Sequence, residues 1–239
     1  MRMPASARRA NLPTGRPLPG WRPRPLPPRT PMPGRLCRLE PLEIRTHAAD
    51  LFEAYRKDPA GRGWTYLPYG PFERPAAFRK WLSAESGRDD PLFFAVVDAT
   101  GRAVGMAGFL RIQPTIGVIE LGHIHFAPRL QKTPAATECI FLMLTRVFDE
   151  LGYRRCEWKC DSLNSASRRA AERLGFTFEG LFRQATVYKG RNRDTAWYSV
   201  IDREWPALRA SFRRWLATSN FWPDGRQRKR LNADRRPAA

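Results

Sequence analysis

The alternation of apolar and polar residues along the chain predicts helices and strands in mixed order. Apolar residues recur at helical spacing in five segments, which we predict as helices at 46–55, 74–86, 134–151, 164–174 and 205–216. Short apolar or alternating runs predict strands at 36–44, 91–98, 103–112, 115–126, 153–161, from 176 onward and at 195–201. This order predicts one α/β domain over residues 36–219.

The two ends of the chain differ from this middle part in composition. The 239 residues carry a net charge of +19, and residues 1–35 hold eight arginines, ten prolines and no acidic residue. Such a segment buries too little apolar surface to offset its ordering entropy, so we predict a disordered arm at 1–35. Residues 220–239 form a second basic tail. Met32 is an alternative start, which leaves open whether residues 1–31 are expressed.

Several classes of protein are excluded by the same composition. No apolar run approaches the ~20 residues that a membrane-spanning helix needs. No apolar stretch follows the first positive charges as it would in a secretory signal. The four cysteines form no Cys-x-x-Cys pair, so we expect reduced core residues, no metal site and a cytoplasmic location.

The most specific motif lies between residues 160 and 180. A strand runs into Asn164, a short helix follows, Gly175 ends it, and Phe176 opens a strand that continues into Glu179-Gly180. Asn accepts a backbone N–H bond at a helix start, and Gly takes the left-handed conformation at a helix end. This arrangement resembles the C-terminal half of the GNAT N-acetyltransferase family, and within it the branch that acetylates ribosomal proteins.

The resemblance implies a fold, a reaction and a cosubstrate. The fold is a central, mostly antiparallel sheet, splayed between its fourth strand (115–126) and fifth strand (153–161) and flanked by helices. The reaction is transfer of an acetyl group from acetyl-CoA to a primary amine, by direct attack in a ternary complex. The acceptor stays unidentified: a protein N-terminus, an amino sugar, a polyamine and an amino acid are all open.

The resemblance also implies a cofactor site where the helix at Pro134 begins. Unpaired amides and the positive end of the helix dipole face an anion there, which suits the CoA pyrophosphate. A main-chain N–H at Phe126 would polarise the thioester carbonyl. The family's two glycines are absent, so an ordinary Pro-initiated helix is the other interpretation. The implied cofactor-binding residues are Phe126, Ala127, Gln131, Lys132, Thr133, Ala135, Ala136, Thr137 and Asn164.

Two residues of the Asn-x-x-Ser motif have two interpretations each. Asn164 resembles the residue that contacts the CoA arm, and Ser167 resembles the general acid that reprotonates the CoA thiolate. Both could instead cap the helix, Asn164 as N-cap and Ser167 three residues later.

The general base is open. The branch carries a Glu seven residues beyond Glu179, where this chain has Thr186. The substitutes are Glu120, His123 and His125. By alternation the histidines share one face of their strand and Glu120 lies on the other, unless a β-bulge intervenes. A histidine near pKa 6.5 is a competent base, although a structural role is equally open.

Other functions compete with catalysis. Thr186 and the missing glycines fit a catalytically silent GNAT-like protein that binds CoA or a partner. The basic tails fit weak, salt-dependent contact with nucleic acid or the ribosome. The family resemblance leaves a homodimer open. The aromatic loop at 61–72 either builds an acceptor pocket or packs over the sheet, and we interpret Asp194 as a turn or strand-start residue.

Overall fold

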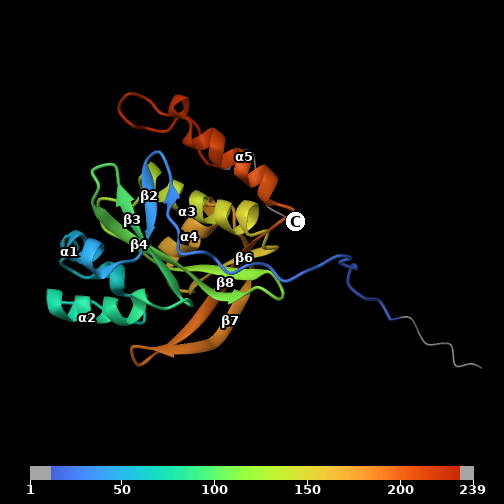
Figure 1. Cartoon of the computed structure of the whole chain (residues 1–239), viewed down its shortest axis with the longest axis horizontal. Coiled ribbons are helices and arrows are strands. Elements are labelled where there is room, and N and C mark those ends of the chain that lie inside the picture. The colour runs from blue at the N-terminus through green and yellow to red at the C-terminus, as the bar shows by residue number, and fades with distance from the viewer. Residues whose placement is uncertain (1–11, 232–239) are drawn as a thin grey trace, which may run out of the picture.

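One eight-stranded sheet organises the described part of the chain, residues 12–231 of a computed structural model (Figure 1). The strand order is β1-β2-β3-β4-β5-β6-β8-β7. The strands are β1 (Met32–Pro33), β2 (Cys37–Pro41), β3 (Leu92–Asp98), β4 (Ala103–Gln113), β5 (Val118–Phe126), β6 (Arg155–Asp161), β7 (Thr177–Tyr188) and β8 (Arg191–Ile201). The helices are α1 (Ile44–Tyr55), α2 (Pro75–Ser86), α3 (Pro134–Thr145), α4 (Ser165–Arg173) and α5 (Trp205–Leu216).

The sheet is antiparallel except where β5 and β6 run parallel. These two strands pair only from Val118 opposite Arg155 to Leu121 opposite Trp158. Both continue beyond that point without pairing to each other, β5 as far as Phe126. The predicted mostly antiparallel sheet, splayed between the strand that carries the histidines and the next one, is therefore confirmed.

Helices cover the sheet on both faces (Figure 1). On one face α1 and α2 pack on β3 and β4, with Leu51 and Phe78 in the smaller of two apolar cores. On the other face α3, α4 and α5 enclose the larger core, which contains Ile140, Trp158 and Phe212. The β7–β8 hairpin extends beyond the rest of the sheet. The four cysteines are buried and unpaired, as predicted.

Some helix and strand boundaries differ from the predicted ones, because hydrogen bonds outside the apolar repeat determine where an element begins or ends. Helix α1 begins at Ile44 rather than after Thr46, because the ring nitrogen Nδ1 of His47 accepts the backbone N–H of Glu43 at 3.0 Å. The predicted helix at 134–151 changes to a π-helical turn after Thr145.

Asp194 is a further boundary difference. It lies inside β8, which begins three residues earlier than Asp194 at Arg191. Its carboxylate accepts the backbone N–H of Gln184 at 2.7 Å, at an irregularity in β7. The residue therefore supports a bend in the neighbouring strand and is not a turn residue.

Part of the N-terminal arm packs on the domain, contrary to the expected disorder. The Trp21 indole donates to the Thr115 carbonyl at 2.9 Å and covers Gly117. The buried guanidinium of Arg146 donates to the carbonyl of Pro31 at 3.1 Å. The expectation fails for this stretch because proline removes donors but keeps carbonyls, which arginine can bind. Residues 1–11 lie outside the described residues.

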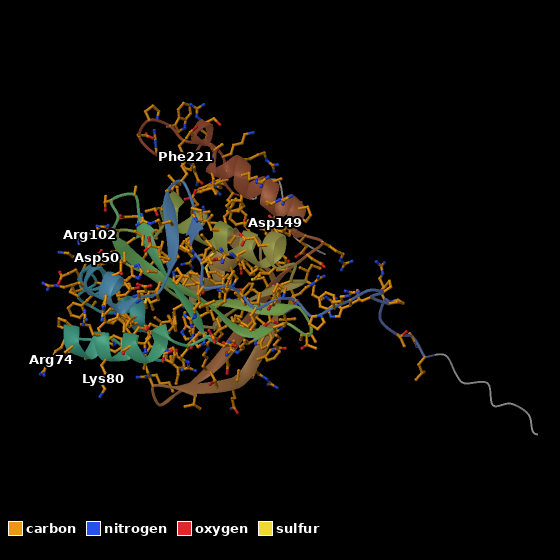
Figure 2. The ribbon with its side chains drawn as sticks, in the orientation of Figure 1. Asp50, Arg74, Lys80, Arg102, Asp149 and Phe221 are labelled. Atoms are coloured by element: carbon orange, nitrogen blue, oxygen red, sulfur yellow. The ribbon has the colours of Figure 1, made fainter. Side chains whose placement is uncertain are left out.

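The basic C-terminal segment also folds back as far as Leu231. The Trp215 indole donates to Gln227 Oε1 at 2.8 Å, and Phe221 pairs with Gln227 in an isolated bridge. Figure 2 shows Phe221 beside α5, where its ring meets that of Trp215 at 5.2 Å. Across residues 12–231, no helix combines the length and apolar character that crossing a membrane requires.

Candidate functional site

A β-bulge in β5 brings the three predicted base candidates to one face of the sheet. Gly122 pairs with Gly108 and His125 with Met106, so β5 has one residue more than β4 in this interval. The extra residue is His123, which has a left-handed φ of 50°. Glu120 precedes the bulge, and the histidines follow it. Simple alternation would have separated them, and the bulge removes that separation.

The His125 side chain packs against aromatic residues of the smaller core. Its ring stacks on Tyr55 with centroids 4.0 Å apart and meets the edge of Trp64 at 3.9 Å. A Cβ on Gly63 would lie 2.5 Å from Nε2, so the loop approaches the ring closely. Burial lowers the pKa of His125 to about 3. The ring is therefore neutral near pH 7 and has little tendency to take a proton.

His123 lies closer to solvent but is also held by aromatic neighbours. Its Nδ1 is 3.0 Å from the Tyr69 hydroxyl, and the two rings stack with an interplanar angle of 15°. Burial, followed by the positive charge of Arg111, lowers the pKa of His123 to about 4. Neither histidine keeps the pKa near 6.5 on which the sequence-based interpretation depended.

Glu120 is the remaining candidate and belongs to a buried ion-pair network. Its side chain is 4% exposed, and its Oε2 lies 2.6 Å from Arg111 Nη1 and 3.0 Å from Lys159 Nζ. Lys159 also pairs with Glu157 at 2.7 Å and lies 3.7 Å from the centre of the Trp197 ring. Buried charges require such partners. The network keeps a carboxylate on the same face as the histidines.

The loop before α3 has the features of an anion site. Thr133 is the N-cap, since its Oγ1 accepts the Ala136 N–H at 3.2 Å, and Pro134 fills the first helical position. Lys132 has a left-handed φ of 60°. Within the described residues, the N–H groups of Lys132 and Ala135 have no hydrogen-bond partner. Free amides at a helix start suit a phosphate group.

Other predicted cofactor residues face inward or are already engaged. The side chains of Ala127 and Thr137 are buried, and Thr137 Oγ1 accepts a hydrogen bond from Arg173 at 3.1 Å. The Gln131 side chain donates to the Phe126 carbonyl at 2.8 Å. Ala127 and Thr137 thus offer no side chain to a ligand. The Gln131 side chain already binds the Phe126 carbonyl, which lies beside the split.

The Asn-x-x-Ser motif lies directly at the split in the sheet. Asn164 is the N-cap of α4, and its Oδ1 accepts the Ser167 N–H at 3.0 Å. The Ser167 Oγ accepts the indole N–H of Trp158 at 2.9 Å. Trp158 is the last residue of β6 that pairs with β5. Capping and a site role are therefore compatible for both residues.

Three hydrogen bonds that the sequence did not indicate join loops over this face. The Tyr66 hydroxyl donates to the Leu163 carbonyl at 3.2 Å, and Lys189 Nζ donates to the Trp64 carbonyl at 2.7 Å. The Tyr188 hydroxyl donates to Asp161 Oδ2 at 2.8 Å. Only the aromatic residues of the 61–72 loop were a signal in the sequence. Gly190 marks the turn at the hairpin tip, but nothing local in the sequence indicates that Lys189 reaches the Trp64 carbonyl.

Comparison with known proteins identifies the architecture. Residues 37–177 match the sequence profile of the acetyltransferase (GNAT) domain. The chain belongs to the GNAT family. A crystal structure of a GCN5-related N-acetyltransferase from Brucella melitensis is 51% identical, covers 90% of this chain and 98% of its own, and has a TM-score of 0.88. No curated protein matches the sequence.

Two further GNAT structures extend this comparison. An acetyltransferase of the GNAT family from Chromobacterium violaceum is 43% identical over 82% of this chain and 98% of its own, with a TM-score of 0.75. A structure from Vibrio cholerae described as a ribosomal-protein-serine acetyltransferase is 20% identical over 72% of this chain and 97% of its own, with a TM-score of 0.62, and shares the fold. The predicted family, fold and enzyme class, an N-acetyltransferase, are confirmed.

Proposed function

We propose that this GNAT protein transfers the acetyl group of acetyl-CoA to a primary amine by direct attack in a ternary complex. One observation carries the proposal: the N–H groups of Lys132 and Ala135 at the start of α3 are free within the described residues. They lie next to the place where β5 and β6 stop pairing with each other, at Leu121. An anion-binding helix start beside an opening in a sheet suits a ligand with a diphosphate and an extended arm.

The cosubstrate and the amine would enter from opposite faces. The pyrophosphate would bind the amides between Gln131 and Ala136, and Asn164 would contact the arm. Beyond Leu121 the main chain of β5 has no β6 partner, so an N–H near Phe126 is free to bond the thioester oxygen. The Gln131 amide would first release the Phe126 carbonyl. Lys132 adds a positive charge to this loop.

Proton transfer is the second half of the proposal. Glu120 would attract the substrate ammonium and take its proton through a bridging water, and Arg111 and Lys159 hold its carboxylate in place. Ser167 would return a proton to the CoA thiolate. Because its oxygen already accepts from Trp158, its own O–H is directed elsewhere.

The test is a titration of the full chain with acetyl-CoA by calorimetry, followed by thiol release with a panel of amines. In Ala135→Glu a carboxylate at the second position of α3 repels the pyrophosphate, and the Kd rises at least about tenfold. Ala76→Glu is the matched control, because Ala76 also follows a proline at the start of its helix. No binding of millimolar acetyl-CoA would refute the proposal.

A catalytically silent CoA-binding protein is the second candidate. Thr186 stands where the related branch has a Glu, and the low pKa values of His123 and His125 remove two substitutes. Binding of acetyl-CoA without thiol release for any amine class would favour this candidate.

The cellular location of the protein and its contact with nucleic acid are proposed on separate grounds. Four buried, unpaired cysteines fit a reducing compartment, so we propose action in the cytoplasm. Weak contact of the basic ends with nucleic acid is a further proposal. It would depend on the exposed arginines of the arm, because Arg29 already pairs with Asp89.

A further inference from the structure

One face of the sheet beyond α1 and α2 carries a set of polar side chains. We call this set the polar face. Cross-strand register brings its members together, since Glu120 is opposite Glu157, Lys159 opposite Trp197 and Asp161 opposite Thr195. Its members are Glu120, Glu157, Lys159, Asp161, Arg193, Thr195 and Trp197.

The carboxylates of the polar face are all engaged within the described chain. Glu120 pairs with Arg111 and Lys159, and Glu157 pairs with Lys159 and Arg155. Asp161 accepts the Tyr188 hydroxyl and a backbone N–H of the following loop. Glu120 and Glu157 are therefore paired with cations without any ligand, and two neutral donors hold Asp161.

Arg193 and Lys189 are hairpin cations that have no such match. Arg193 donates from Nε to Thr195 Oγ1 at 3.1 Å, and within residues 12–231 it has no carboxylate partner. Lys189 donates to the Trp64 carbonyl, and it too has no carboxylate partner there. Because only Nε of Arg193 is used, its two terminal nitrogens remain available. Thr195 holds this guanidinium on the polar face, with the Tyr188 ring 5.9 Å away.

Further positive charge lies near the end of α2 and the end of β4. The Arg111 side chain is 55% exposed, and Arg88 follows α2. Burial first, and then Arg111, Arg88 and Arg193 in that order, lower the pKa of His123. Asp90 opposes them, and its oxygens accept the backbone N–H groups of Arg111 and Ile112. Cations thus approach His123 from two sides.

Other cations near this end of the molecule do not contribute to this arrangement. Figure 2 shows Arg74 and Lys80 projecting from α2 into solvent, away from the sheet. Arg102 pairs with Asp50 of α1 at 2.6 Å, at the outer edge of the domain (Figure 2). Arg74, Lys80 and Arg102 therefore add no positive charge to the polar face.

We propose that the acceptor amine carries an anionic group, a carboxylate or a phosphate, which Arg193 binds while the amine approaches Glu120. This inference rests on the proposed acetyl transfer and names its substrate class. A purely cationic acceptor such as a polyamine would be repelled by Arg193 and Lys189. An anionic group neutralises that repulsion, and the free terminal nitrogens of a guanidinium bind it in bidentate fashion.

The experiment compares acceptors that differ in one charge. Thiol release is measured for glycine against glycinamide, for L-phenylalanine against its amide, for O-phosphoethanolamine against ethanolamine, and for spermidine. The anionic member of a pair is preferred, and Arg193→Gln lowers its kcat/KM about ten- to hundredfold while leaving the neutral member unchanged. Arg214→Gln, which removes an exposed charge from α5 on the other side of the sheet, changes neither.

A binding measurement makes the result independent of turnover. N-acetyl-L-phenylalanine and its amide are titrated by calorimetry into CoA-loaded protein, and the acid binds more tightly in wild type but not in Arg193→Gln. Preference for spermidine or the amides, equal losses for both members of a pair, or no binding of either N-acetyl compound would overturn the inference. Failure of acetyl-CoA itself to bind refutes the proposed function. Titrations of N-acetyl-L-phenylalanine and its amide into the free protein would still test whether Arg193 binds an anionic group.

Discussion

The indole N–H of Trp158 donates to Ser167 Oγ at 2.9 Å, which ties the last residue of β6 that pairs with β5 to the first turn of α4. The contact fixes a hydroxyl at the opening between β5 and β6. A motif that could be explained by helix capping alone is thereby also a feature of the split in the sheet.

Replacing Ser167 with Ala separates these two roles. Asn164 still caps α4 through the Ser167 N–H, so we expect little change in stability or in the Kd of acetyl-CoA. We expect kcat to fall about tenfold, below the usual 10²–10⁴ for a general acid, because a thiolate is a good leaving group. Stopped-flow thiol release measures this, with Ser165→Ala as control. Unchanged kcat would remove Ser167 from the chemistry.

Glu120→Gln tests the proton acceptor. The amide keeps the size of the side chain but cannot take a proton, so we expect kcat to fall about 10²-fold or more with an unchanged Kd for acetyl-CoA. Glu157→Gln is the matched control, because Glu157 shares Lys159 and is similarly buried. The steady-state rate is followed from pH 6 to 9. Equal losses in both variants would indicate a merely structural network.

His123 and His125 should make stability depend on pH. Their folded-state pKa values, about 4 for His123 and about 3 for His125, lie below that of an unfolded histidine. As pH falls below ~6.5 the unfolded chain binds protons first, so stability present above that pH declines by about 1.4 kcal/mol per unit per histidine.

Urea unfolding at pH 7 and pH 5.5 measures this slope. His123→Phe keeps an aromatic ring against Tyr69 and should remove about half of the decline. Proton NMR of the chain's three histidines offers a second check, since two of them should stay neutral at pH 5. Titration of both near pH 6.5 would contradict the burial argument.

Glu138 should be the most sensitive carboxylate for folding. It is buried in α3 and accepts the backbone N–H groups of Arg35, Leu36 and Cys37 at 3.1, 2.5 and 2.9 Å. Glu138→Gln turns an amide donor toward these donors, so the free energy of unfolding should fall by about 1–3 kcal/mol.

Glu53→Gln is the control for this loss, because Glu53 forms an exposed pair with Arg56 and should cost less than about 1 kcal/mol. Both are measured by urea unfolding at pH 7. Equal losses in the two variants would show that the turn before β2 does not depend on Glu138.

The elements with local signals were predictable. Pro134 and Thr133 start α3, Asn164 caps α4, and α5 spans the predicted residues Trp205–Leu216. In each case a cap or an apolar repeat within a few residues decides the conformation. The motif at 160–180 likewise gave the family, since its spacing is local.

The arrangement of the candidate site could not be predicted in the same way. The bulge at His123 depends on pairing with β4, and it alone puts Glu120 and the histidines on one face. Packing of Tyr55 and Trp64 around His125, which lowers its pKa, joins segments up to 70 residues apart.

The sequence by itself thus determined the secondary structure, the family and the residues available for chemistry, because hydrophobic periodicity and caps act over short distances. Only the tertiary structure decided which carboxylate lies between two cations, which histidine is enclosed and which cations lack a carboxylate partner. Burial and charge pairing depend on residues that are far apart in the chain and meet only after folding.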